Sequence, residues 1–161
     1  MIYVLIGVVL FLLYQQRSVS TPKATAGLEI YDEYKDAIDL ASARFGIPKT
    51  RIVAIIGVES GGDPHAVGTS GETGLMQLTQ GALDDVNNTY GTYYTKLLVQ
   101  DGVTNIQAGV RYLAWLKSNL NNNLDLATEA FNAGIGTIQN GGTDKSYLDK
   151  IYAYEDSFTI T

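Results

Sequence analysis

The chain has 161 residues, of which 45% are hydrophobic, and its formal net charge is -6 at pH 7. This length suits one compact domain with a tail and is too short for two domains of ordinary size. The acidic balance, without any stripe of Lys and Arg, argues against a nucleic-acid partner, and the absence of cysteine excludes disulfides and thiolate metal sites.

The chain opens with an apolar run. Residues 2–14, IYVLIGVVLFLLY, carry no charge, and a helix of that length spans roughly 20 Å at ~1.5 Å per residue. We expect residues 1–17 to form an N-terminal transmembrane or signal-anchor helix that contacts the lipid membrane through residues 2–14, although this run is shorter than the roughly 30 Å hydrocarbon core. A cleaved signal peptide and a buried core helix are the alternatives.

Small and polar residues with one proline follow over residues 18–27, SVSTPKATAG. This is the composition of a linker, so we expect the folded domain over residues 28–161. Its first helix is predicted to begin near Leu28, because apolar residues recur from there at helical spacing as far as Phe45. The glycine and the proline that follow are typical of a helix end.

Further helices are predicted by apolar residues at helical spacing over four segments: 48–60, 106–120, 126–131 and 147–158. Asp125 and Asp144 lie just before the last two segments and are the expected N-caps, while Gly134 is an expected C-cap. The predicted fold class is therefore mainly α.

One carboxylate stands on an apolar helix face. Ile52, Ile55 and Ile56 form one face of the helix expected over residues 48–60, and Glu59 continues that face at the next turn. Desolvation at such a position raises the pKa of a carboxyl group, which then stays protonated near neutrality and can donate a proton. The alternative is that Glu59 lies at the helix end and bends out to water.

A glycine-rich segment over residues 61–75 follows this carboxylate. We expect a flexible loop or a short hairpin that folds back over the helix end. The segment lacks the Lys and the strand-to-helix context of a phosphate-binding loop. His65 is the only histidine of the chain, and with no cysteine beside it the composition argues against a catalytic metal site.

Three short blocks stand out in order along the chain: Glu59-Ser60, Gly74-Leu75-Met76-Gln77 and Ala130-Phe131-Asn132-Ala133-Gly134. Together they resemble the signature motifs of the lytic transglycosylases with a soluble-lytic-transglycosylase-like (SLT) catalytic domain. In that family a stretch similar to residues 105–113, NIQAGVRYL, precedes the third block. The resemblance covers residues 28 to 155 and implies a lysozyme-like helical domain, with the glycine-rich loop or hairpin at its active site.

The resemblance also implies roles for single residues. Glu59 matches the catalytic acid of the family. The implied substrate-binding residues are Ser70, Met76, Gln77, Phe131, Asn132 and Tyr147. The sequence departs from the family pattern at two positions, because the family usually has tyrosine in place of Phe131 and often has serine in place of Gly68. The second departure leaves Ser70 as the nearest hydroxyl group.

The implied reaction cleaves the β-1,4 bond between N-acetylmuramic acid and N-acetylglucosamine in peptidoglycan strands, which are the implied partner. Glu59 protonates the bridging oxygen, the N-acetyl group stabilises the developing charge, and the Glu59 carboxylate then takes the proton of the muramic C6 hydroxyl. The product ends in 1,6-anhydro-N-acetylmuramic acid. No water is consumed, and neither a metal nor an organic cofactor is implied.

Two other functions stay open on the sequence alone. A hydrolytic muramidase needs a second carboxylate to activate water, and Glu72 and Asp63 are available for that role, Glu72 being the first to test. A non-catalytic glycan-binding structural protein is the other alternative, against which the presence of Glu59 argues.

The apolar run implies a membrane-anchored location, either in the bacterial cell envelope or in the internal membrane of a phage virion. Arg17 and Lys23 follow the run, which by the positive-inside tendency places the domain on the cytoplasmic side. This orientation fits a phage particle better than an ordinary wall enzyme. Local opening of the cell wall would then serve phage entry or an envelope-spanning apparatus.

Overall fold

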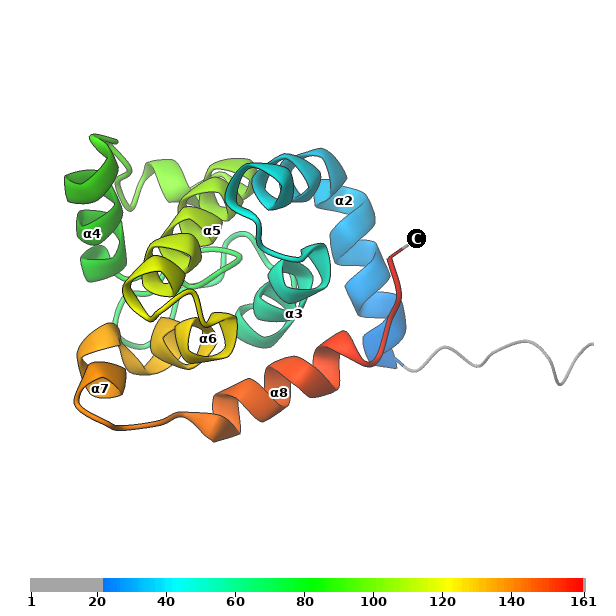
Figure 1. Cartoon of the computed structure of the whole chain (residues 1–161). Coiled ribbons are helices and arrows are strands. Elements are labelled where there is room, and N and C mark those ends of the chain that lie inside the picture. The colour runs from blue at the N-terminus through cyan, green and yellow to red at the C-terminus, as the bar shows by residue number, and fades with distance from the viewer. Residues whose placement is uncertain (1–21, 161) are drawn as a thin grey trace, which may run out of the picture.

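The computed structural model describes residues 22–160. The helices in this range are, in chain order, α2 Pro22–Phe45, α3 Lys49–Glu59, α4 Gln80–Tyr90, the 3-10 helix η1 Leu98–Gln100, α5 Gly102–Asn119, α6 Leu124–Ala133, α7 Ile135–Gln139 and α8 Lys145–Glu155. Within the same range the only β structure consists of isolated bridges. The domain is therefore mainly α, as the hydrophobic periodicity predicts (Figure 1).

Helix α2 begins earlier than the sequence predicts. Residues 22–27 form its first turns instead of a linker, so the folded domain does not begin at Leu28. Gly27 shows the physical reason, because a Cβ atom at this position would lie 2.7 Å from the Phe158 ring. The end of the chain thus packs against the first turns of α2 and includes them in the domain (Figure 1).

The predicted N-terminal anchor over residues 1–17 lies outside the described residues, as do residues 18–21 of the predicted linker. Among residues 22–160, no helix combines the length and the apolar character needed to cross a membrane.

Helix α3 occupies the middle of the domain. Its three isoleucines, Ile52, Ile55 and Ile56, are completely buried, as their spacing predicts. The helix packs against α2 on one side and α8 on another, while α5 packs on α2, α4 and α6 (Figure 1). Since Glu59 is the last residue of α3, the packing of this central helix fixes where the carboxyl group emerges.

Helix α4 is not predicted by the pattern of apolar residues. Thr79 caps its start, where the side-chain oxygen accepts a hydrogen bond from the Ala82 N–H at 3.1 Å, and Gly91 ends it with a left-handed backbone (φ 62°). Its buried side is narrow, consisting of Ala82, Leu83 and Val86. The helix therefore depends on its caps and on packing against α5 more than on a long apolar stripe.

The predicted caps of the later helices are partly right. The Asp144 side chain caps α8, and Gly134 follows α6 as its C-cap, which confirms both predictions. Asp125 is not a cap. Asn123 takes this role, because its side-chain oxygen accepts hydrogen bonds from two backbone N–H groups of the first turn of α6, both at 3.0 Å.

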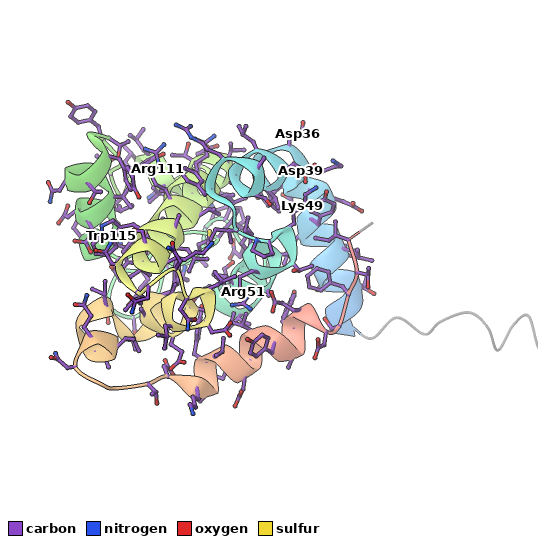
Figure 2. All side chains as sticks on the ribbon, in the orientation of Figure 1. Asp36, Asp39, Lys49, Arg51, Arg111 and Trp115 are labelled. Atoms are coloured by element: carbon purple, nitrogen blue, oxygen red, sulfur yellow. The ribbon has the colours of Figure 1, made fainter. Side chains whose placement is uncertain are left out.

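A buried arginine ties three helices together. Arg51 of α3 is 5% exposed, and its Nε lies 2.8 Å from Oε1 of Glu155 on α8. Its Nη1 lies 3.3 Å from Oδ1 of Asp125 and donates to Oγ1 of Thr128 at 2.8 Å, both on α6. Figure 2 shows Arg51 beside α8, near the middle of the domain. The true role of Asp125 is thus an ion pair with Arg51.

Candidate active site

A cavity opens beside the end of α3. Its lining residues are Glu59, Gly68, Thr69, Glu72, Gln77, Thr79, Phe131 and Asn132. They come from α3, from the glycine-rich segment that follows it, from the start of α4 and from the end of α6. The packing of the helices therefore brings segments that are far apart in sequence to the same cavity.

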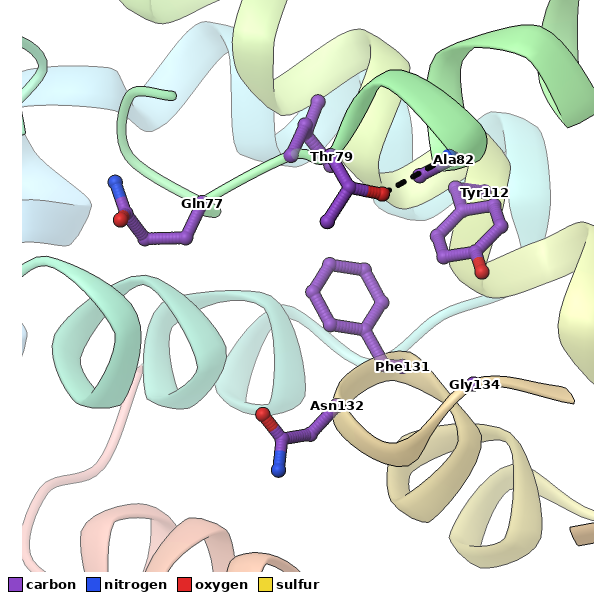
Figure 3. Close-up of a pocket in the computed structure, with 8 residues that line it drawn as sticks. Gln77, Thr79, Ala82, Tyr112, Phe131, Asn132 and Gly134 are labelled. Carbon is purple, nitrogen blue, oxygen red and sulfur yellow. Dashed lines mark hydrogen bonds between the residues drawn. The ribbon is translucent and has the colours of Figure 1, made fainter. Parts of the chain in front are cut away.

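A second cavity adjoins the first. Its lining residues are Gln77, Leu78, Thr79, Ala82, Tyr112, Phe131, Asn132 and Gly134 (Figure 3). Gln77, Thr79, Phe131 and Asn132 line both cavities, so the two are parts of one depression, which we call the groove. Its far end is aromatic, because the rings of Tyr112 and Phe131 lie 5.6 Å apart between centroids.

The Glu59 carboxyl group is half-buried at the wall of the groove. Burial raises the pKa of Glu59, and the negative charge of Glu72 raises it further. The hydrogen bond from Tyr147 and the positive charge of Lys150 act in the opposite direction and lower this pKa. The Tyr147 hydroxyl donates to Oε1 of Glu59 at 2.5 Å. A carboxyl group with a raised pKa and a fixed orientation is suited to donate a proton.

Tyr147 belongs to the buried side of α8 and is 5% exposed. Desolvation, together with the neighbouring Glu59 charge, holds the pKa of its phenol well above the usual value. The phenol therefore stays protonated and acts as a hydrogen-bond donor to Glu59. It contacts the Glu59 carboxyl group but lines neither cavity.

The glycine-rich segment folds back over the end of α3. Isolated antiparallel bridges join Val67 to Thr73 and Thr73 to Leu78, so the segment has the course of a short, irregular hairpin. Asn105 of α5 holds it from behind, because its Nδ2 donates to the Thr73 carbonyl at 2.9 Å and its Oδ1 accepts from the Met76 N–H at 2.8 Å. Asn105 is completely buried.

Asn105 also explains why a glycine, Gly74, stands in the second sequence block. Gly74 has a φ of 77°, and a Cβ atom there would lie 2.3 Å from Nδ2 of Asn105. Sequence reasoning missed the role of Asn105. The available signal was a polar residue immediately before Ile106, in a helix whose buried positions are otherwise mostly apolar.

Gly68 and Glu72 share one region of the groove. A Cβ atom on residue 68 would lie 2.2 Å from Oε2 of Glu72, so the glycine leaves room for the Glu72 carboxylate. This carboxylate accepts a hydrogen bond from the Ser70 N–H at 3.0 Å. Hydrogen bonds from backbone N–H groups lower its pKa, and Glu72 therefore stays ionised at the cavity where the pKa of Glu59 is raised.

Lys96 is a second support that sequence reasoning missed. Its Nζ donates to the carbonyl oxygens of Gly71 at 2.6 Å and Leu78 at 2.5 Å. The ammonium group therefore joins the glycine-rich segment to Leu78, which follows it. Desolvation lowers the pKa of Lys96, while the charge of Glu72 opposes that shift.

The predicted substrate-binding residues do not all lie at the groove. Gln77, Phe131 and Asn132 line it. Met76 is completely buried and packs against α5, where its sulfur would be 2.5 Å from a Cβ atom on Gly109. The prediction that Met76 lines the groove is therefore wrong, because the backbone that Asn105 holds at the Met76 N–H directs Met76 into the core. The next residue, Gln77, has a left-handed backbone (φ 45°) and lines both cavities.

Ser70 is exposed and is not among the residues that line the groove. Its backbone N–H donates a hydrogen bond to the Glu72 carboxylate. Asp63 is likewise outside the groove, and its carboxylate accepts from the His65 N–H at 2.8 Å. Among residues 22–160, no group of three or more His, Cys, Asp or Glu residues lies close enough to hold a metal ion.

Comparison with known proteins agrees with this geometry. The sequence pattern of the family described as "Transglycosylase SLT domain" matches residues 36–153. The chain belongs to the transglycosylase SLT domain family. This finding confirms the resemblance carried by the three sequence blocks.

Curated relatives of this SLT domain include two proteins named membrane-bound lytic murein transglycosylase C. The protein of Edwardsiella ictaluri is 33% identical over 116 residues, and the match covers 66% of this chain and 32% of the relative. The protein of Shigella sonnei is 32% identical over the same length, with the same coverage. The chain thus spans about a third of the length of the curated relatives it matches.

Solved structures show the same fold. An inactive mutant of the lytic transglycosylase Slt from Pseudomonas aeruginosa superposes with a TM-score of 0.66 at 25% identity, covering 76% of this chain and 23% of that one. The 70 kDa soluble lytic transglycosylase of Escherichia coli gives a TM-score of 0.69 at 24% identity, covering 77% of this chain and 24% of that one. The described domain therefore has the lysozyme-like SLT fold.

Proposed function

We propose that the chain is a peptidoglycan lytic transglycosylase that cleaves the β-1,4 bond between N-acetylmuramic acid and N-acetylglucosamine. The observation that carries this proposal is the Glu59 carboxyl group. It lies at the groove of an SLT domain, and burial raises its pKa. The names of the curated relatives support the same activity.

The chemistry requires one group that first gives and then takes a proton. Protonated Glu59 donates to the oxygen that bridges the two sugars, and the N-acetyl group of the muramic residue stabilises the positive charge that develops at C1. The Glu59 carboxylate then accepts the proton of the C6 hydroxyl, whose oxygen bonds to C1. The broken bond is C1 to the bridging oxygen, and the product is a 1,6-anhydro sugar.

A hydrolytic muramidase is the second candidate function, because Glu72 lines the same cavity as Glu59. The backbone hydrogen bonds that lower the pKa of Glu72 keep it ionised, as a base that activates water must be. Asp63, the other carboxylate considered from the sequence, does not line the groove and is not retained.

The products distinguish the two enzymes. Digestion of purified peptidoglycan is expected to release muropeptides that end in 1,6-anhydro-N-acetylmuramic acid, lighter by one water than reducing-end products, because no water enters the reaction. Mass spectrometry measures the difference directly. Glu72→Gln is expected to keep turnover within about threefold of wild type, since a positioned acid or base contributes about 10²-fold or more. Reducing ends that incorporate labelled water oxygen, and that disappear in Glu72→Gln, would establish the hydrolase instead.

Tyr147→Phe is expected to move the pH dependence of cleavage to higher pH. The hydroxyl stabilises ionised Glu59, so its removal raises the Glu59 pKa further. Because the first step needs protonated Glu59, kcat/KM falls as pH rises through this pKa, and the basic limb of the profile follows it upward.

A pH–rate profile of kcat/KM measures this effect. Tyr154→Phe is the matched control, because Tyr154 is a buried tyrosine of the same helix and none of its side-chain hydrogen bonds in the described chain goes to a carboxylate. Its basic limb is expected at the wild-type pH. A basic limb of Tyr147→Phe that stays in place or moves to lower pH would contradict the role assigned to the hydroxyl.

The same proposal includes a place in the bacterial cell envelope, with residues 2–14 as a membrane anchor. The apolar sequence of these residues and the word "membrane-bound" in the names of the curated relatives support it. Membrane fractionation of the full chain tests the anchor. The comparison is with a shortened protein that lacks residues 2–14. This protein must still include all of α2, which starts at Pro22, and therefore cannot begin at Leu28. Location in a phage virion and action in phage entry or for an envelope-spanning apparatus stay predictions from the sequence.

A further inference from the structure

The Asp144 side chain contacts a residue that lines the groove and the first turn of α8. Its Oδ2 accepts a hydrogen bond from Nδ2 of Asn132 at 2.6 Å. Its Oδ1 accepts from the Tyr147 N–H at 3.2 Å and from the Ser146 hydroxyl at 3.0 Å. The Asp144 carboxylate thus joins Asn132, which lines the groove, to the first turn of α8. This helix carries Tyr147, the residue that donates to Glu59.

The backbone of Asp144 is also held. Glu129 of α6 is 4% exposed, and its Oε2 accepts a hydrogen bond from the Asp144 N–H at 2.6 Å. Glu129 and Asn132 stand one turn apart on the same helix, so α6 grips both the backbone and the side chain of Asp144. Such double attachment leaves the carboxylate little freedom to turn away from Asn132.

A carboxylate fixes the orientation of the amide bonded to it, because an ionised carboxylate only accepts hydrogen bonds. The hydrogen bond from Asn132 is the largest cause of the lowered pKa of Asp144, which therefore stays ionised. Asn132 must consequently turn its nitrogen toward Asp144. Figure 3 shows the amide nitrogen on the side of α8 and the oxygen on the side of α3.

The amide oxygen of Asn132 makes no hydrogen bond in the described part of the chain, and the residue is exposed where both cavities meet. It is therefore free to accept a hydrogen bond from a ligand. The hydroxyl groups and amide N–H groups of an N-acetylated sugar are such donors.

We infer that Asp144 is a positioning residue for the glycan: it turns the Asn132 amide so that an acceptor oxygen faces the groove, and it anchors the first turn of α8. The inference rests on the proposed function for the identity of the ligand. Asp144 touches neither the substrate nor the reacting atoms in this assignment, and it acts through Asn132 and through the helix that carries Tyr147.

The test separates two roles of Asp144, the N-cap of α8 and the orientation of the Asn132 amide. Asp144→Ser keeps an N-cap, since serine and aspartate cap helices about equally well, but its shorter side chain does not reach Asn132. Asp101→Ser is the matched control, because Asp101 caps α5 in the same way, accepting from the Thr104 N–H at 2.8 Å, and does not line the groove. Both variants are expected to melt at similar temperatures.

The first readout is binding of a β-1,4 oligomer of N-acetylglucosamine, measured by calorimetry in a Glu59→Gln background so that no cleavage occurs. Asp144→Ser is expected to weaken binding about tenfold, the usual loss of a charge-assisted hydrogen bond network, and Asp101→Ser to leave it unchanged. Equal affinities for the two variants would overturn the inference, whether or not the wild-type chain cleaves peptidoglycan.

The second readout is a double-mutant cycle on kcat/KM. If Asp144 acts on the ligand through Asn132, Asp144→Ser lowers kcat/KM in the wild-type background and has little further effect in Asn132→Ala. Losses that simply add would overturn this coupling. Failure of the wild type to release any product would instead contradict the proposed function, and the binding readout still decides the inference.

Discussion

Glu59→Gln is expected to abolish release of muropeptides from purified peptidoglycan while leaving the domain folded. Glutamine keeps the size and polarity of the side chain but has no proton to transfer, and a positioned acid typically contributes about 10²- to 10⁴-fold to the rate. The raised pKa and the hydrogen bond from Tyr147 support the assignment of this carboxyl group as the acid. Chromatography with mass detection of the soluble products measures the loss.

The matched control is Glu29→Gln, which removes an exposed glutamate on α2 and is expected to keep full activity. More than about a tenth of wild-type activity in Glu59→Gln would place the acid elsewhere, given the usual size of this contribution. A wild-type chain that binds glycan but releases no product would favour the non-catalytic binding protein.

Glu59→Gln is also expected not to lower the melting temperature near neutral pH. The folded-state pKa of Glu59 is raised, so folding disfavours the ionised form, and this penalty is present at pH values above the unfolded pKa and absent below it. Removing the charge removes the penalty. A clear loss of stability would show that the carboxylate holds the structure together rather than serving catalysis.

Arg51→Met is expected to cost about 3 to 5 kcal/mol of the free energy of unfolding, the usual loss when one partner of a buried ion pair is removed. The side chain of Arg51 is 6% exposed and that of its partner Glu155 is 16% exposed. Without the guanidinium, the Glu155 carboxylate loses its counter-charge while it stays largely out of water. Denaturation by urea, followed by circular dichroism, measures the change.

Lys35→Met is the matched control. Lys35 lies 2.6 Å from Asp39, a shorter contact than any of Arg51, but the Lys35 side chain is 54% exposed, so water screens its charge. Asp39 also keeps Lys49 as a second partner at 2.7 Å. Figure 2 shows Asp39 near the edge of the domain and Arg51 near its middle. We expect little change in stability for Lys35→Met. Comparable losses in the two variants would show that burial does not govern the strength of these pairs.

Local sequence patterns were sufficient to predict much of the candidate site. The spacing of the three isoleucines placed Glu59 at the end of a buried helix face, and α3 ends there. The third block placed Phe131 and Asn132 at one helix end, and both line the groove. The position of Glu59 follows from the period of 3.6 residues within one helix, whereas the places of Phe131 and Asn132 follow from the resemblance to the family.

Predictions were wrong where the deciding contact was distant. Residues 22–27 look like a linker, but Phe158 packs on Gly27 and includes them in the domain. Met76 matches a groove residue of the family, but the backbone held by Asn105 turns it into the core. Helix α4 has too narrow an apolar side to be recognised without the helix it packs on.

The sequence by itself determined the mainly helical class and the family, and it indicated Glu59 as the candidate acid, because periodicity and short motifs are read along the chain. Only the tertiary structure decided what surrounds the acid: the Tyr147 hydroxyl from α8, the space beside Gly68 that Glu72 occupies, and the carboxylate of Asp144 that turns Asn132. These contacts join residues on different elements. Their geometry depends on how whole helices pack, and the pKa of Glu59 depends on the burial that this packing creates.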